Sequence, residues 1–246
     1  MSSAPGGGDS PAHEGKPTRT AGSDPPSAPS DLAARLPLKF TEIDLGRASI
    51  GLFTLPDPDV LLDAMTQEEF DRNDGRMPYW AVLWPSAIAL ARIVLEGEIP
   101  AGRRVLDLGC GLGLAGIAAL HRGADVTFFD WEASAVRLAR ASAYAGGFSA
   151  VSTVAADWRA PPPLAPFDLV LGADVLYEAR NGPAVAAFLA RHVVPGGEAW
   201  IVDPDRLHAK DWPADLARVG LTVRTTTPLP PAGDATRLTL RKVARA

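Results

Sequence analysis

From residue 102 to the C-terminus, short apolar runs alternate with stretches whose apolar residues recur at helical spacing. The run RRVLDLG at 103–109 predicts a strand, and LAGIAALHRG at 114–123 predicts the helix that follows it. Six further strands are expected in ADVTFFD, AVSTVAAD, FDLVLGAD, GGEAWIVD, LTVRTTT and TRLTLRKV. Strands that alternate with helices are typical of an α/β protein with a doubly wound, mostly parallel sheet. No helix separates the last two strands, so we expect the last strand of this seven-stranded sheet to be antiparallel.

The segment before this region carries a hairpin pattern and two helical patterns. Apolar residues alternate or cluster over 40–53, as in a β-hairpin. Residues 57–70 begin with helix-start signals and continue with apolar residues at helical spacing. The strongly apolar segment 77–97 predicts a helix that is kinked at Pro85 or begins there, because proline is best tolerated in the first turn.

The composition of the first residues differs from that of the rest. Residues 1–37 are mostly Ser, Pro, Gly and Ala, and they hold no aromatic residue. Such a segment buries too little apolar surface to offset the entropy lost on ordering, so we expect a disordered tail. Residues 38–246 then form one domain, with the hairpin and helices at 38–101 and the α/β core at 102–246.

Composition and charge exclude several classes of protein. The net charge is −5 and no run is rich in Lys or Arg, which argues against a nucleic-acid partner. Cys110 is the single cysteine, so an internal disulfide is excluded and a metal site would lack a thiolate pair. No apolar stretch is typical of a membrane span or a signal peptide. We expect a cytoplasmic monomer without a bound metal.

Closely spaced glycines follow the first core strand. Gly111, Gly113 and Gly116 match GxGxxG, the fingerprint of dinucleotide-binding enzymes. The triplet nearest the strand is instead Gly109, Gly111 and Gly113. In a doubly wound sheet this turn lies beside the ligand, and glycine lets the backbone bend sharply and approach it closely. We therefore interpret the loop as a binding loop rather than a tight turn alone.

Asp107, the last outward-looking residue of that strand, distinguishes between a dinucleotide and S-adenosyl-L-methionine as the ligand of the loop. Next to a pyrophosphate, a carboxylate costs several kcal/mol at about 4 Å and surface-like screening. S-adenosyl-L-methionine instead presents a sulfonium cation and an amino group, which an acidic residue attracts. Asp107 and the glycine frame thus argue against a nicotinamide-dependent reductase, which stays an alternative.

Two further carboxylates end the next two strands. Asp130 lies 21 positions after Gly109, where a carboxylate can accept both ribose hydroxyls, although it would also serve as a helix N-cap. Asp157 and Trp158 end the third strand. We predict that this pair contacts an adenine ring, through its amino group and its face.

These motifs together resemble a known family. VLDLGCGLG, Asp130, ADW and FDLVLGADVLYE, in this order, resemble the seven-β-strand, S-adenosylmethionine-dependent methyltransferases. The upstream PYWAVLWPSAIALA is similar to the branch rich in protein-lysine methyltransferases. The resemblance covers roughly residues 38–245. It implies a Rossmann-like methyltransferase fold, S-adenosyl-L-methionine as cofactor and a protein lysine as methyl acceptor.

The resemblance also implies site residues. By position, the family's cofactor contacts fall on Trp84, Gly109, Cys110, Gly111, Asp130, Trp158 and Ala173. The element GADVLY matches the D-x-x-Y element of lysine methyltransferases and implies that Asp174 and Tyr177 bind the substrate at the methyl-transfer site. We assign Asp174 as the carboxylate facing the target amine, and Tyr177 as a wall and hydrogen-bond partner. Packing alone stays open for Tyr177, and Glu178 is a weaker acid–base candidate.

Other residues receive simpler interpretations. We place Tyr79, Trp80 and Trp84 on the helix before the core, with Trp80 as core and Trp84 freed by Pro85 to cover the cofactor. The segment DPDR at 203–206 either shapes the substrate pocket or is only a turn. The histidines lack partners at metal-ligand spacing and are expected at the surface; they are His13, His121, His192 and His208.

Three alternatives to a lysine methyltransferase remain. In the first alternative, the acceptor is a small-molecule amine or another protein residue. It stays open because loops set acceptor specificity, and a single sequence does not reveal what those loops bind. The nicotinamide-dependent reductase is the second alternative. A non-catalytic binding module on the same scaffold is the third, and the intact Asp107, Asp130 and Asp174 argue against it.

Overall fold

The computed structural model describes residues 36–64, 78–97, 99–232 and 236–246. The centre of this part of the chain is a seven-stranded sheet in the order β5-β4-β3-β6-β7-β9-β8. Five neighbouring strands are parallel, and β9 runs antiparallel to both β7 and β8. The strands are β3 (Arg104–Leu108), β4 (Asp125–Asp130), β5 (Ser152–Ala155), β6 (Phe167–Ala173), β7 (Val193–Asp203), β8 (Leu221–Ala232) and β9 (Thr236–Arg245).

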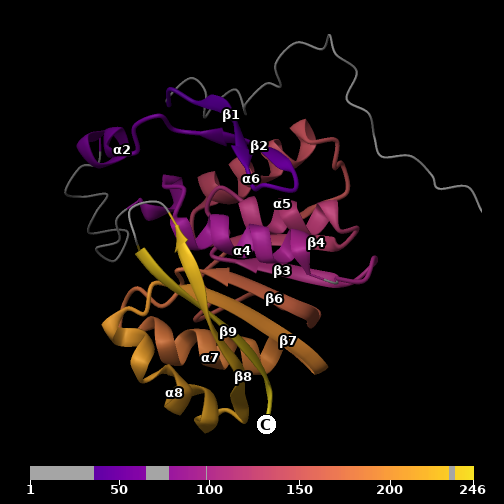
Figure 1. Ribbon diagram of the computed structural model, residues 1–246, viewed down its shortest axis with the longest axis vertical. Coiled ribbons are helices and arrows are strands. Elements are labelled where there is room, and N and C mark those ends of the chain that lie inside the picture. The colour runs from indigo at the N-terminus through magenta and orange to yellow at the C-terminus, as the bar shows by residue number, and fades with distance from the viewer. Residues whose placement is uncertain (1–35, 65–77, 98, 233–235) are drawn as a thin grey trace, which may run out of the picture.

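Helices cover both faces of this sheet, as Figure 1 shows. One face carries α4 (Pro85–Glu96), α5 (Leu114–His121) and α6 (Ala133–Ala145). The other carries α7 (Asn181–His192) and α8 (Trp212–Arg218), and the short η2 (Leu207–Lys210) precedes α8.

The strands supply both cores because successive side chains point to opposite faces. Val105 packs in the cluster with α4, α5 and α6, whereas Leu106 packs in the cluster with α7 and α8. On β4, Phe128 and Phe129 divide in the same way. Burial on both faces explains why these strands read as nearly continuous apolar runs.

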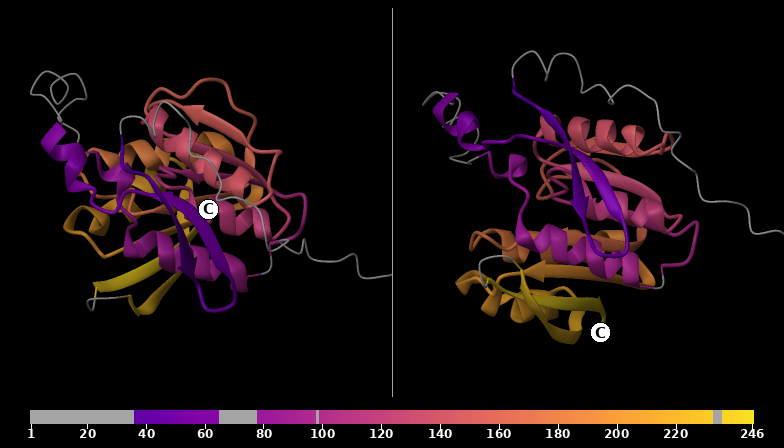
Figure 2. Two further views of the ribbon diagram at one scale, coloured as in Figure 1. Left: turned by 90° about the horizontal axis from the view of Figure 1, so that it is seen from above. Right: turned by 45° about the horizontal axis from the view of Figure 1, so that its top comes forward.

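A two-stranded hairpin lies outside the main sheet. β1 (Lys39–Asp44) and β2 (Ser49–Thr54) pair antiparallel, and the hairpin lies across the helices on the α4–α6 face (Figure 2). The backbone N–H of Phe53 donates to Ser142 Oγ of α6 at 2.9 Å, which fixes the hairpin to that helix. α2 (Asp59–Ala64) follows it.

The α/β class, the seven strands, the antiparallel last strand and the hairpin are therefore confirmed. Of the two possibilities for the apolar segment 77–97, the structure has the helix start: α4 begins at Pro85, and the short η1 (Tyr79–Ala81) precedes it. Trp84 is the extended N-cap residue of α4, so the three aromatic residues lie before that helix and not on it. The predicted tail lies almost wholly outside the described residues, as does the second half of the helix expected over 57–70.

Candidate active site

A cavity of about 330 Å³ opens at the carboxyl ends of the central strands. The strand order reverses between β3 and β6, and ligands of doubly wound sheets bind beyond the strand ends at this point. All twelve residues predicted for the site line this cavity. They are Trp84, Asp107, Gly109, Cys110, Gly111, Gly113, Asp130, Asp157, Trp158, Ala173, Asp174 and Tyr177.

The glycine loop adopts backbone conformations that favour glycine. Gly113 is the N-cap of α5 with φ of 85°, in the left-handed region. A Cβ atom there would lie 2.5 Å from Ala139 Cβ, so the helix crossing requires glycine as well. At Gly111 a Cβ would lie 3.0 Å from the backbone oxygen of Trp80, which brings the η1 segment close against the loop.

The last glycine of the GxGxxG pattern serves packing inside the protein. Gly116 lies in the buried first turn of α5, and a Cβ there would lie 2.4 Å from Phe128 Cε1. The match to a dinucleotide fingerprint thus reflects close packing of α5 on β4.

We expect Gly116→Ala to lower the free energy of unfolding by about 1–3 kcal/mol, because the new methyl group overpacks this contact. Urea unfolding measures the change. Gly146→Ala is the matched control, since its φ is −78° and its new Cβ would come no closer than 3.3 Å to another atom. Equal unfolding free energies for the two variants would contradict the packing role.

Asp107 is a buried carboxylate at the floor of the cavity, 2% exposed. Its Oδ2 accepts a hydrogen bond from the backbone N–H of Gly116 at 2.8 Å. Burial raises the pKa of Asp107 to about 7; the Gly116 bond opposes this shift and the charge of Asp130 adds to it. A cation bound nearby would favour the ionised form.

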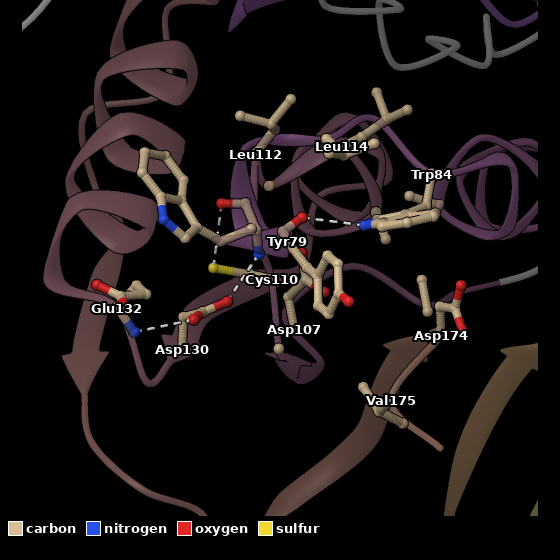
Figure 3. Close-up of a pocket in the computed structure, with 18 of the residues that line it drawn as sticks. Tyr79, Trp84, Asp107, Cys110, Leu112, Leu114, Asp130, Glu132, Asp174 and Val175 are labelled. Atoms are coloured by element: carbon tan, nitrogen blue, oxygen red, sulfur yellow. Dashed lines mark hydrogen bonds between the residues drawn. The ribbon is translucent and has the colours of Figure 1, made fainter. Parts of the chain in front are cut away.

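Asp130 connects the glycine loop to the end of β4. Its Oδ2 accepts from the backbone N–H of Gly111 and its Oδ1 from that of Glu132, each at 2.9 Å (Figure 3). Two ionised carboxylate oxygens offer about four lone-pair sites, so acceptor capacity remains for hydroxyl groups.

The predicted adenine contacts lie beside this loop. Trp158 packs against Gly109, where a Cβ would lie 3.3 Å from the indole. The Asp157 carboxylate accepts from the backbone N–H of Arg159 at 2.8 Å and from its Nε at 2.7 Å. The Arg159 guanidinium in turn lies over the Trp131 ring at 5.8 Å. Trp131 also lines the cavity and was not predicted.

Aromatic side chains enclose the other part of the cavity. The Trp84 indole N–H donates to the backbone oxygen of Tyr79 at 3.0 Å, which orients the ring (Figure 3). Tyr79 meets the rings of Trp84 and Tyr177 edge to face, at 5.9 and 5.8 Å between centroids. Trp80 packs partly against the core, as predicted, but it also lines the cavity.

Asp174 follows β6 directly and lies across the view of Figure 3 from Asp130, with Asp107 between them. Its φ is 55°, a left-handed conformation that costs a non-glycine residue about 1–3 kcal/mol and is common at functional sites. Its carboxylate accepts two hydrogen bonds from Arg206, which sequence reasoning did not assign to the site. The only signal for Arg206 was its place in DPDR after β7, next to β6 in the sheet.

Cys110 and His192 are both buried. Cys110 is buried, and burial raises the pKa of its thiol well above the usual value, so the thiol stays protonated. The expectation that His192 lies at the surface is wrong: it is 6% exposed and stacks on Phe188 at the end of α7. Its Nδ1 lies 2.9 Å from the Phe188 backbone oxygen, which satisfies the buried ring.

Comparison with known proteins agrees with this geometry. Residues 105–197 match the family model described as a methyltransferase domain. The N-methyltransferase NodS from Bradyrhizobium japonicum, solved with S-adenosyl-L-homocysteine, shares the fold with a TM-score of 0.53 at 17% identity. That alignment covers 77% of this chain and 93% of NodS. The chain therefore contains a segment that matches a methyltransferase domain, within a fold that it shares with NodS.

In sequence, parts of the chain are similar to protein-lysine methyltransferases. An electron transfer flavoprotein beta subunit lysine methyltransferase of Xenopus laevis is 31% identical over 55% of this chain. A protein N-lysine methyltransferase of Danio rerio is 35% identical over 45% of it. The chain spans about half the length of these relatives, 56% and 54%.

Proposed function

We propose that this protein transfers a methyl group from S-adenosyl-L-methionine to the side-chain amine of a protein lysine. The observation that carries the proposal is the cavity itself, in which a glycine loop and two carboxylates at one end meet a carboxylate and aromatic walls at the other. The similarity to lysine methyltransferases supports the choice of acceptor.

The residues present fit this cofactor. Asp107 and Asp130 give this part of the cavity an acidic lining that suits a cationic ligand, and the glycine loop leaves room for close approach of the backbone. When bound, the cofactor supplies an activated methyl group for in-line displacement. Asp130 is proposed to hold the ribose, Asp157 and Trp158 the adenine, and Asp107 the amino-acid end.

The protein's own contribution to the reaction is positioning and exclusion of water. Holding the nucleophile in line can supply on the order of 7–11 kcal/mol of the barrier. Tyr79, Trp84 and Tyr177 form apolar walls that desolvate the acceptor amine, which favours its neutral, reactive form. Asp174 is proposed to orient this amine. The unperturbed lysine pKa is about 10.4, so the amine must lose a proton before it attacks.

Methyl labelling tests the proposed function. Lysate from the source organism with this gene deleted would be incubated with purified protein and methyl-labelled S-adenosyl-L-methionine. A discrete labelled protein band, with the label mapped to lysine by mass spectrometry, is the expected result. Label confined to small molecules would overturn the acceptor class, and no label anywhere would favour the non-catalytic binding module.

The raised pKa of Asp107 makes cofactor binding depend on pH. Below about pH 7 the free protein holds Asp107 protonated, and this neutral acid no longer attracts a cation. We expect the affinity for S-adenosyl-L-methionine to be roughly fivefold to tenfold weaker at pH 6 than at pH 7.5. Titration calorimetry measures this ratio. Asp107→Asn should remove it, and an unchanged ratio in that variant would exclude Asp107 as its source.

Location, oligomeric state and the lack of a nucleic-acid partner stay predictions: we propose a cytoplasmic monomer that acts on a protein substrate. In the part of the chain that the structure describes, no helix is long and apolar enough to cross a membrane. The same residues contain no group of three or more His, Cys, Asp or Glu side chains that could hold a metal ion.

A further inference from the structure

The Asp174 carboxylate is held by an arginine from the next strand end. Arg206 Nε donates to Asp174 Oδ1 at 2.7 Å, and a terminal guanidinium nitrogen donates to Oδ2 at 2.9 Å. This bidentate geometry is the strongest form of arginine–carboxylate pairing. The Asp174 side chain is 7% exposed and that of Arg206 is 36% exposed, so the pair lies at the boundary between cavity and solvent.

A second set of contacts fixes the segment that carries Arg206. Arg241 of β9 pairs with both Asp203 and Asp205, and Thr239 Oγ1 donates to Asp205 Oδ2 at 2.7 Å. The backbone N–H of Asp205 donates to Asp203 Oδ1 at 2.7 Å, closing a turn in which Asp205 has φ of 53°. The segment is therefore more than a surface turn, because three side chains of the neighbouring strand end and of β9 determine its path.

We propose that Arg206 is a positioning residue for methyl transfer: it fixes Asp174 as a hydrogen-bond acceptor for the incoming amine and makes the site favour the neutral amine over the ammonium ion. This inference rests on the proposed function, since it concerns the acceptor end of the same cavity.

The physical reason is the charge balance at Asp174. A lone carboxylate beside a lysine side chain stabilises the ammonium ion, which has no lone pair with which to attack. With Arg206 bound, the negative charge is already paired, while the carboxylate keeps lone pairs that can accept an N–H from the amine. The hydrogen bonds to Asp174 raise the pKa of Arg206, so the guanidinium remains charged.

The other groups around this point do not reverse that balance. Asp203 is fully buried, burial raises its pKa, and Arg241 pairs with it. Asp205 is also paired with Arg241. Glu178 pairs with Arg180. The remaining titratable groups near the pair are the phenols of Tyr79 and Tyr177.

The step balances without a further reactant. The ammonium ion of the acceptor gives its proton to solvent at the open side of the cavity, and the neutral nitrogen enters. Its lone pair forms the new N–C bond while the C–S electron pair stays on sulfur, so the positive charge moves from sulfur to nitrogen. Asp174 accepts a hydrogen bond throughout and need not take up the proton.

The pH dependence of kcat tests this role. In Arg206→Gln we expect the rising limb of the pH profile to move up by about one pH unit, the usual effect of losing one nearby charge. Arg206→Lys should restore most of the wild-type profile, and affinity for S-adenosyl-L-homocysteine should change less than twofold. Arg218→Gln is the control, because Arg218 forms a surface pair with Asp215 on α8. A lower rate with an unshifted profile would overturn the inference and leave Arg206 a structural role.

A binding measurement that needs no turnover separates this inference from the proposed function. n-Butylamine would be titrated into protein saturated with S-adenosyl-L-homocysteine, at pH 7 and pH 10. The wild-type protein should bind it more tightly at pH 10, and Arg206→Gln should reduce that preference at least threefold. An identical preference in both proteins would overturn the inference. If wild-type protein labels no lysine, the proposed function fails, and the butylamine series still decides the role of Arg206.

Discussion

Asp174→Asn is expected to reduce methyl transfer by roughly 100-fold or more, because a misplacement of about 1 Å at the reacting centre costs on this order. Affinity for S-adenosyl-L-methionine should change less than about twofold. Asparagine matches the size of aspartate and tolerates the left-handed conformation at φ of 55°. It offers only one acceptor oxygen, however, so the amine and Arg206 must compete for it.

The same strand provides a matched control. Asp168 lies at the opposite end of β6, where it accepts hydrogen bonds from Arg103 and from the backbone N–H of Arg104. Asp168→Asn should leave turnover within about twofold of wild type. Single-turnover methyl transfer with saturating cofactor measures both variants. Normal turnover by Asp174→Asn would remove Asp174 from the proposed mechanism and bring Tyr177 or Glu178 forward.

Asp130→Ala is expected to weaken S-adenosyl-L-methionine binding by roughly tenfold to hundredfold. Hydrogen bonds to a charged group contribute about 1.5–3 kcal/mol, and the substitution removes the carboxylate proposed to hold the ribose. Titration calorimetry measures the affinity. Unchanged affinity would exclude the ribose role.

Asp130 also supports the glycine loop itself, so its variant needs a separate stability measurement. The backbone N–H groups of Gly111 and Glu132 both lose their acceptor in Asp130→Ala. Thermal unfolding without ligand reports this loss, and Asp130→Asn keeps one acceptor oxygen. Asp125→Ala, at the exposed start of β4, is the matched control and should affect neither measurement. If Asp130→Ala weakens cofactor binding and lowers the ligand-free unfolding free energy by the same amount, Asp130 supports the loop rather than the ribose.

Much of the site was predictable because strand order and strand direction place certain residues together. Asp107 is the penultimate residue of β3, Asp130 ends β4 and Asp174 directly follows β6. The carboxyl ends of such parallel strands share one edge of the sheet. Locating the strands in the sequence therefore locates these carboxylates without any knowledge of side-chain contacts. Their individual roles toward the cofactor and acceptor remain predictions.

The contacts and burial that the sequence analysis missed depend on how side chains pack in three dimensions. Arg206 reaches Asp174 across a gap between two loops, and no spacing in the sequence records that distance. His192 could have been read as buried, because it lies four residues after Phe188 on the apolar face of α7. At Pro85 the sequence allowed either a kink or a helix start, and the structure has the start.

Because β9 lies between β7 and β8, the residues proposed for the two ends of the cavity come from different parts of the chain. Of the residues proposed to hold the cofactor, Asp107 lies on β3, Asp130 ends β4 and Asp157 follows β5, whereas the supports of Arg206 come from β7 and β9. Substitutions in the β8–β9 hairpin are therefore expected to alter the proposed acceptor end and to leave the residues proposed for nucleoside binding unchanged. With the roles proposed above, acceptor specificity could change during evolution while cofactor binding is kept. The same hairpin is a defined segment to exchange in protein engineering.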